Sequence, residues 1–159
     1  MKIDILVVGK IKEKFYSDAI AEYSKRLSRY AKLSIIEVKD EKTDENASAH
    51  EDELVMSKEA ERLEKYIDEN AMIVPLCIEG EQTTSEGFAD MITDWENKGY
   101  SHIQFIIGGS LGIHSSLKAK GKVKLSFSKM TFPHQLMRVI LLEQIYRAYR
   151  IKNNEPYHK

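Results

Sequence analysis

The fold is decided by two short apolar runs that each end in glycine, IDILVVG at residues 3–9 and IQFIIGG at residues 103–109. An apolar run interrupted by a single polar residue is typical of a strand buried on both faces, as in a parallel sheet. Leu33–Val38 and Ala71–Ile78 predict two further strands. Lys122–Phe127 alternates polar and apolar residues, which predicts a half-buried strand.

Helical patterns fill the intervals between these strands, over residues 12–30, 51–69, 84–97 and 133–151. Alternating strands and helices predict an α/β fold, with a mostly parallel sheet flanked by helices. No repeat or linker divides the chain, so we expect a single domain over residues 1–159. Pro75 lacks the N–H that a central strand uses, which indicates either an edge strand or a strand that bends near its end.

The composition excludes several classes of protein. Hydrophobic residues make up 42% of the chain and charged residues 31%, which is typical of a globular domain. Cys77 is the only cysteine, so no disulfide can form within the chain, and we expect a buried thiol in a reducing, cytoplasmic protein. No histidine pair has metal-binding spacing, and no apolar run approaches the ~20 residues of a membrane span. We therefore expect neither a metal site nor membrane association.

Charge is distributed unevenly along the sequence. Residues 118–159 contain ten Lys or Arg and two Asp or Glu, whereas residues 1–117 contain 14 and 23. A basic end of this kind suits an anionic partner such as a nucleic acid. The alternative is a solvated basic surface that is balanced by an acidic one, and charge alone does not separate the two.

Three segments should meet at the carboxyl ends of the strands, where open parallel sheets bind their ligands. They are residues 76–80, the glycine-rich residues 108–112, and residues 126–132 with the sequence SFSKMTF. The glycines match neither the dinucleotide fingerprint nor the P-loop, and alone they are more typical of a tight turn. Segment 126–132 combines hydroxyl and large apolar side chains, which suits either a pocket wall or an ordinary capped helix start.

The last predicted helix and the tail after it are unusual. Residues 133–151 are apolar nearly all round, which favours packing against a second copy of the chain over a central helix in a single core. Arg147 and Arg150 lie on one face of this helix. The chain then ends with Tyr157, His158 and Lys159. An aromatic ring, an imidazole and a cation could stack on a base, accept a proton and hold a phosphate.

Several motifs together resemble one known family. They are GGSLG at 108–112, LS at 125–126, TFPHQL at 131–136, RV at 138–139, EQIYRA at 143–148 and PYH at 156–158. With the opening KIDILVVG at residues 2–9, the resemblance spans the whole chain and points to the RlmH family. Its members are ribosomal RNA large-subunit methyltransferases of the SPOUT superfamily.

The resemblance implies a homodimer with a trefoil knot in the C-terminal half of each chain and S-adenosylmethionine bound in that knot. The reaction it implies is methylation of N3 of a pseudouridine in the 23S rRNA of the large ribosomal subunit. Mapped onto this sequence, the cofactor-binding residues would be Leu76, Gly108, Phe127, Ser128, Lys129, Met130, Thr131 and Phe132.

The tail would supply the catalytic groups. His158 would accept the N3 proton, Tyr157 would contact the base and Lys159 would hold the RNA backbone, while Arg147 and Arg150 add positive field toward the substrate RNA. We expect the tail to lie against a cofactor cleft, that of its own chain or that of its partner.

Two residues depart from the family pattern, in which aspartate is common at the position of Cys77 and arginine at that of Lys159. Lysine lacks the bidentate fork of arginine, so a phosphate contact by Lys159 is less secure. Two alternative functions remain open: a non-catalytic ribosome- or RNA-binding factor of the same fold, and a SPOUT methyltransferase acting on tRNA. Because most of the chain is acidic, we expect recognition of an assembled particle through its shape as well as its phosphates.

Overall fold

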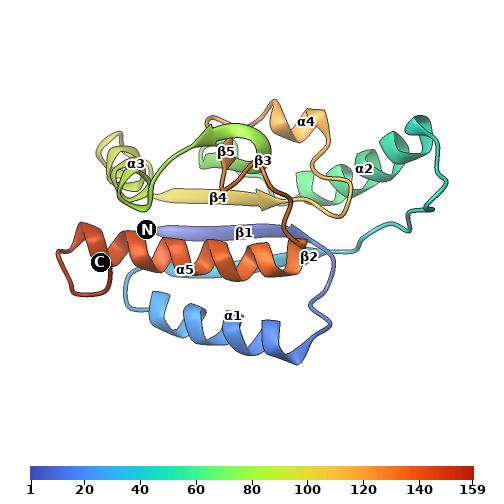
Figure 1. Cartoon of the computed structure of the whole chain (residues 1–159). Helices are drawn as coiled ribbons and strands as arrows, with labels where there is room; N and C mark the ends of the chain where they lie inside the picture. Colours follow the sequence, from blue (N-terminus) through green and yellow to red (C-terminus); the bar gives the residue numbers. More distant parts are fainter.

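A computed structural model describes all 159 residues and contains one five-stranded parallel sheet with the strand order β2-β1-β4-β3-β5 (Figure 1). The strands are β1 Lys2–Val8, β2 Lys32–Val38, β3 Met72–Gln82, β4 His102–Ile107 and β5 Leu125–Ser126. The helices are α1 Lys14–Leu27, α2 Ala49–Glu64, α3 Ser85–Asn97, α4 Ser115–Lys118 and α5 His134–Lys152. The predicted α/β fold with a parallel sheet is confirmed.

Strand β1 is central because its apolar run can be covered on both faces. Every residue from Ile3 to Val8 is buried. β1 pairs in parallel with β2 on one side and with β4 on the other, and Val7 lies opposite Ile107. This register places the glycines that follow both strands at the same edge of the sheet.

Successive side chains of the strands enter two separate hydrophobic cores. Ile3 and Ile5 belong to the larger core, which contains buried residues of α1, α3 and α5. Leu6 and Val8 belong to the smaller core, which contains buried residues of α2 and α4. The period of two along each strand thus assigns three helices to one face and two to the other.

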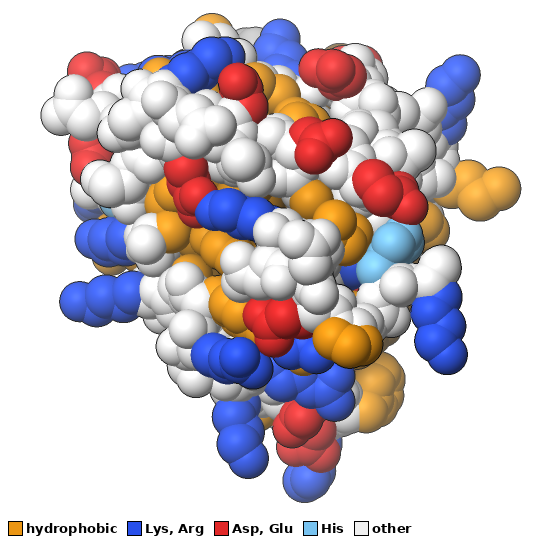
Figure 2. All heavy atoms as spheres, turned by 90° about the vertical axis from the view of Figure 1, so that its left-hand side faces the viewer, with side chains coloured by type: hydrophobic (Ala, Val, Ile, Leu, Met, Phe, Trp, Pro, Cys, Tyr) orange, Lys and Arg blue, Asp and Glu red, His pale blue; other side chains and the backbone are white.

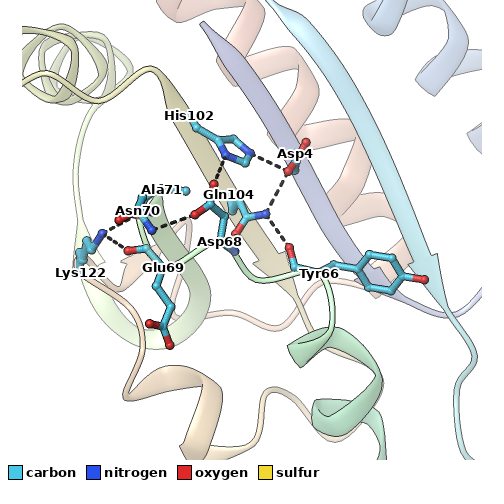
Figure 3. A network of polar contacts seen from close by, with 9 residues as sticks. All are labelled: Asp4, Tyr66, Asp68, Glu69, Asn70, Ala71, His102, Gln104 and Lys122. Carbon is cyan, nitrogen blue, oxygen red and sulfur yellow. Dashed lines mark hydrogen bonds and ion pairs between the residues drawn. The ribbon is translucent and has the colours of Figure 1, made fainter.

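A polar network at the opposite, amino-terminal edge accommodates the one buried charged side chain of the central strand (Figure 3). Asp4 is 3% exposed, and its Oδ2 lies 2.6 Å from Nε2 of His102 and accepts a hydrogen bond from Gln104 at 3.0 Å. His102 also contacts Asp68 at 3.2 Å, and Gln104 donates to the carbonyl oxygen of Tyr66 at 2.8 Å. The network connects β1 and β4 to the segment that precedes β3.

The second half of the sheet differs from the expectations. β3 is not an edge strand: it pairs with β4 up to Pro75 and then with β5, with a register break between Leu76 and Glu81. Proline cannot donate a ladder hydrogen bond, and here it marks the point where β3 leaves β4, which is the bending alternative. The expected strand over 122–127 shrinks to β5, whose two residues are both buried.

Some helix boundaries also differ from the predicted ones. α2 ends at Glu64 rather than near residue 69, and the short helix α4 was not expected. α3 begins as predicted, because the Thr84 side chain caps it by accepting from the Gly87 N–H at 2.9 Å. No helix is both long and apolar enough to cross a bilayer. The trefoil knot stays a prediction.

Candidate active site

The three strand-end segments converge on one cleft of about 660 Å³. A volume of this size suits a cofactor or drug-sized ligand. Its lining comes from residues 76–79 at the bend of β3, residues 107–113 after β4 and residues 125–134 around β5, with Lys118 and Met137 completing the wall; Lys129 does not line it.

The residues that the resemblance assigned to a cofactor fall almost entirely in this lining: Leu76, Gly108, Phe127, Ser128, Met130, Thr131 and Phe132. The exception is Lys129, whose side chain is exposed outside the cleft. The structure therefore brings seven of the eight predicted cofactor-binding residues together in one cleft and leaves Lys129 outside it.

The glycine loop forms one wall through its backbone. A Cβ atom at Gly108 would lie 2.5 Å from the carbonyl carbon of Gly112, so no side chain fits there. Gly112 has φ of +92°, in the region that favours glycine, and it forms a β-bridge with Gly109. A Cβ at Gly109 would come within 3.1 Å of the carboxylate of Glu59. This loop exposes main chain rather than side chains to the cleft.

Segment 126–132 forms the facing wall and is ordered by its own hydroxyl groups. Ser126 Oγ donates to the Ser128 carbonyl oxygen at 3.1 Å, and Ser128 Oγ accepts from the Met130 N–H at 2.9 Å. The ring of Phe127 packs edge-on against Phe88 of α3, with the centroids 6.1 Å apart. These turns combine apolar wall with backbone polar groups, as the pocket interpretation of this segment predicted.

His134 at the start of α5 brings an unpaired polar atom to the cleft. Its Nδ1 is buried and has no hydrogen-bond partner within the chain. Burial, together with the nearby Arg138 guanidinium, lowers the pKa of His134, so the imidazole is neutral near pH 7. A buried nitrogen without a partner in a ligand-sized cleft is suited to a ligand hydrogen bond.

Two further cleft residues come from segment 76–80, which was expected at this edge, but neither was given a role. Cys77 was expected to be a buried structural thiol, but it is partly exposed and lines the cleft. Burial and the nearby Glu79 raise the pKa of Cys77, so it remains a thiol near neutral pH. Glu79 pairs with Lys118 across the lining, and this ion pair lowers the pKa of the Glu79 carboxyl. The contribution of Lys118 could not be found from the sequence, because it depends on the position of α4.

The C-terminal tail does not lie in the cleft of its own chain. None of Tyr157, His158 and Lys159 lines it. After α5 the chain turns at Asn154, which has φ of +53°, and folds back over α5. Tyr157 Oη donates to Glu143 at 3.0 Å, so the tail rests beside the second half of that helix.

The end of the tail is anchored well away from His134, the α5 residue that lines the cleft. His158 contacts Arg147, which lies about 20 Å further along the α5 axis than His134 at 1.5 Å per residue. In Figure 1 the C terminus lies at the end of the molecule opposite the tips of β1 and β4. Of the two alternatives for the tail, the cleft of its own chain is therefore disfavoured, and the cleft of a partner chain stays a prediction.

Both ring nitrogens of His158 are engaged. Nδ1 lies 3.1 Å from Nη1 of Arg147, and Nε2 lies 2.5 Å from Oε1 of Glu86. Arginine can only donate, so Nδ1 accepts, and the ring proton on Nε2 is donated to Glu86. This hydrogen bond lowers the pKa of the Glu86 carboxyl. Burial, with the hydrogen bond to Glu143, raises the pKa of Tyr157 to about 12.

The two arginines expected to face RNA hold the tail instead. Arg147 donates to Glu143 from Nε at 3.0 Å and from Nη2 at 2.5 Å, and its guanidinium stacks over the Tyr157 ring. Arg150 pairs with Glu155, and its Nη2 donates to the Pro156 carbonyl oxygen at 2.8 Å. Any contact of these side chains with RNA stays a prediction.

Six of the ten basic residues in residues 118–159 form ion pairs, four of them with acidic residues from earlier in the chain. These four pairs are Lys118–Glu79, Lys120–Glu64, Arg138–Glu37 and Lys152–Glu96. Figure 2 views the end that contains the tail, where acidic and basic side chains lie beside one another around exposed hydrophobic ones. The charge asymmetry is therefore balanced in part within the chain. The remaining four lysines form no ion pair: Lys122, Lys124, Lys129 and Lys159. No cluster of three or more His, Cys, Asp or Glu side chains is arranged to hold a metal ion.

Comparison with known proteins places this architecture among methyltransferases. Residues 1–158 match the family described as "Predicted SPOUT methyltransferase". The chain is 59% identical to "Ribosomal RNA large subunit methyltransferase H" of Bifidobacterium adolescentis and 55% identical to the protein of that name from Clostridium botulinum, each over 159 residues and the full length of both chains. A Legionella pneumophila methyltransferase solved with bound SAM has a similar fold, with a TM-score of 0.50 at 10% identity, covering 94% of this chain and 66% of that one.

Proposed function

The chain belongs to the ribosomal RNA large subunit methyltransferase H family of SPOUT methyltransferases, and from this we propose that it methylates N3 of a pseudouridine in the 23S rRNA of the large ribosomal subunit. The methyl donor is S-adenosylmethionine, and the enzyme works in the cytoplasm, where ribosomes are. The observation that carries the proposal is the cleft itself: three loops far apart in sequence meet there, and they include nearly all residues that the family uses for its cofactor.

The cleft residues fit this cofactor. The glycine loop and segment 126–132 offer main-chain groups to a polar ligand, whereas Leu76, Phe127 and Phe132 offer apolar walls to an adenine ring. The buried, unpaired Nδ1 of His134 supplies one further polar group. When bound, S-adenosylmethionine supplies an electrophilic methyl group on a positively charged sulfur. The sulfur is the leaving group and becomes a neutral thioether.

We further propose that the active enzyme is a homodimer. Leu136, Val139 and Ile140 of α5 are partly exposed and belong to neither core, which leaves an apolar stripe for a second copy. If two copies of α5 pack in opposite directions, the tail of one chain comes close to the cleft of the other. The catalytic tail then acts on the partner's cofactor, because its own cleft lies along α5 in the other direction.

The protein's own residues have two tasks in this reaction, alignment and proton removal. The cleft orients the donor against the attacking nitrogen, which supplies much of the rate enhancement of a direct displacement. His158 accepts the N3 proton on Nδ1, the ring nitrogen that already accepts from Arg147. Tyr157 anchors the tail through Glu143, and Lys159, which is exposed and forms no ion pair, contacts a phosphate.

Recognition of an assembled ribosomal particle follows from the overall charge. The formal net charge of the chain is −1, and 23 of its 25 acidic residues lie in residues 1–117, so the net electrostatic attraction to naked RNA is small. Shape complementarity to a folded rRNA surface then supplies the remaining specificity. We expect large subunits or whole ribosomes to be methylated much faster than protein-free 23S rRNA under the same conditions.

The decisive experiment is mass spectrometry of rRNA and tRNA from a strain that lacks the gene. Loss of one methylated pseudouridine in 23S rRNA, restored by the intact chain, supports the proposal. Loss of a tRNA methylation instead would identify a tRNA methyltransferase of the same fold. Unchanged RNA, together with no heat on titration of the purified protein with S-adenosylmethionine, would indicate a non-catalytic ribosome-binding factor.

A further inference from the structure

We propose that Glu86 is a positioning residue for proton removal: its carboxylate holds the Nε2–H of His158 and so makes Nδ1 the atom that accepts the proton of the substrate. This inference rests on the proposed function, because it takes His158 as the base. It adds a residue of α3, far from the tail in sequence, to the catalytic arrangement.

The first turn of α3 fixes the Glu86 carboxylate. Thr84 caps the helix by accepting from the Gly87 N–H at 2.9 Å, which sets the direction of this turn. A carboxylate in the first turn is also stabilised by the helix dipole. Its Oε1 lies 2.5 Å from Nε2 of His158, a short distance for a charge-assisted hydrogen bond. The lowered pKa of Glu86 keeps it ionised at neutral pH.

The contact at the other ring nitrogen of His158, Nδ1, shows where a proton donor would lie. Arg147 places Nη1 at 3.1 Å from Nδ1 of His158, in the position that an N–H of the substrate must take. Arg147 does not depend on this contact, because its Nε and Nη2 donate to Glu143. A substrate imide can therefore replace one arginine N–H while the guanidinium remains anchored.

In the methyl-transfer step, Glu86 and Arg147 have opposite effects on the positive charge that develops on His158. The N3 proton passes to Nδ1, the N3 electron pair forms the new N–C bond, and the C–S bond pair of the donor leaves with the sulfur. His158 becomes an imidazolium, which releases its proton to water after the transfer. The Glu86 carboxylate, at Nε2, stabilises the imidazolium, whereas the Arg147 guanidinium, at Nδ1, destabilises it. Two further charged groups are near: Glu143, which pairs with Arg147, and Lys159, the next residue in the chain. A carboxylate that orients a histidine and stabilises its cation is the arrangement of the Ser-His-Asp triad.

The test compares Glu86→Gln with Glu96→Gln in the full-length enzyme acting on ribosomes. Glutamine at 86 can still accept a hydrogen bond but has no charge to stabilise the imidazolium. Glu96 is the matched control, because it lies on the same helix and pairs with Lys152 of α5 without contacting His158. We expect E86Q to lower kcat about tenfold with KM nearly unchanged, and to shift the acid limb of the pH–rate profile toward lower pH. E96Q should match the wild type in both.

A second measurement needs no turnover. In protein labelled with 15N-histidine, His158 should carry its proton on Nε2, and the resonance of that proton should lie further downfield in the wild type than in E86Q, because the wild-type hydrogen bond is charge-assisted. An unchanged Nε2–H resonance and pH profile in E86Q, or an equal fall in kcat for E86Q and E96Q, would overturn the role of Glu86. If His158→Ala itself retains full activity, the choice of base in the proposed function is wrong and this inference goes with it. If His158→Ala is inactive and E86Q is normal, only this inference fails.

Discussion

The two ends of α5 are built from different kinds of contact. At its start, the cleft consists of glycine turns, hydroxyl-ordered loops and apolar walls, and the buried Arg138 nearby pairs with the exposed Glu37. At its end, the tail is held by partly exposed charged groups, Glu143, Arg147 and Glu86, around His158. The cleft is complete within one chain, whereas the tail holds a reactive group that faces no cleft of its own chain. The proposed homodimer would bring these two ends together, with the tail of one chain beside the cleft of the other.

The largest effect should come from the tail. His158→Ala should reduce methylation of ribosomes by about 1000-fold, the middle of the range for loss of a general base. Its affinity for S-adenosylmethionine, measured by calorimetry, should stay unchanged because the cleft is untouched. A chain truncated after Pro156 should behave in the same way. Normal methylation by the truncated chain would contradict the division between the two ends.

Mixing a tail variant with a cleft variant tests whether the tail acts between chains. Refolded together in equal amounts and assayed at a concentration of S-adenosylmethionine too low to fill the weakened cleft, His158→Ala and Gly108→Ala should form mixed dimers in which one intact cleft meets one intact tail. About a quarter of the wild-type activity should return if subunits mix at random. No recovery, with mixed dimers verified by native mass spectrometry, would show that each chain uses its own tail.

The next effect in size is on stability and concerns Arg138, the one buried cationic side chain. Arg138 is 1% exposed, and its Nη1 donates to Glu37 at 2.6 Å and its Nη2 to the Gly9 carbonyl oxygen at 2.6 Å. Arg138→Leu leaves the Gly9 carbonyl oxygen without this donor, whereas water can solvate the exposed Glu37, and the free energy of unfolding should fall by about 2 kcal/mol in urea titrations. Arg26→Gln, which breaks the exposed pair with Glu22, should change it by less than about 0.5 kcal/mol. Equal losses in both variants would remove the contrast between a buried and an exposed arginine.

Next in size is the effect of a methyl group in the glycine loop. Gly108→Ala forces a Cβ into the carbonyl of Gly112, so the loop must move and the affinity for S-adenosylmethionine should fall about tenfold. Gly99→Ala is the control, because Gly99 has φ of +95° at the end of α3 and no atom within 4 Å of a Cβ. It should lower stability by about 1 kcal/mol without changing that affinity. Unchanged binding by G108A would exclude this loop from the cofactor site.

The smallest effect concerns the buried carboxylate beneath Gly109. Burial raises the pKa of Glu59 above its ordinary value of 4.5, so the folded chain binds its proton more readily than the unfolded chain. The stability contributed by this group is complete below pH 4.5 and is lost as pH rises through the raised pKa. Glu59→Gln should therefore add about 1 kcal/mol at pH 7.5 and nothing at pH 4, whereas the exposed Glu61→Gln should change neither value. A loss of stability in E59Q at pH 7.5 would reverse this assignment.

Much of the sheet and of the cleft could be predicted, because their signals are local. IDILVVG and IQFIIGG became β1 and β4, and Thr84 marked the start of α3. Parallel strands end at a common edge, so the loops after β3 and β4 had to meet. Periodicity failed at β3 and β5, where Pro75 and a register break rather than a side-chain pattern decide the pairing.

The sequence by itself determined the fold class, the family and which loops would form the cleft, since apolar periodicity and short motifs are properties of neighbouring residues. Only the tertiary structure decided which charges neutralise one another and where the tail lies. Glu86 contacts His158 although the two residues are 72 positions apart in the sequence, and no sequence pattern predicts such a pair. Long-range contacts depend on how α3 and α5 pack on the sheet, and that packing turned the tail away from its own cleft.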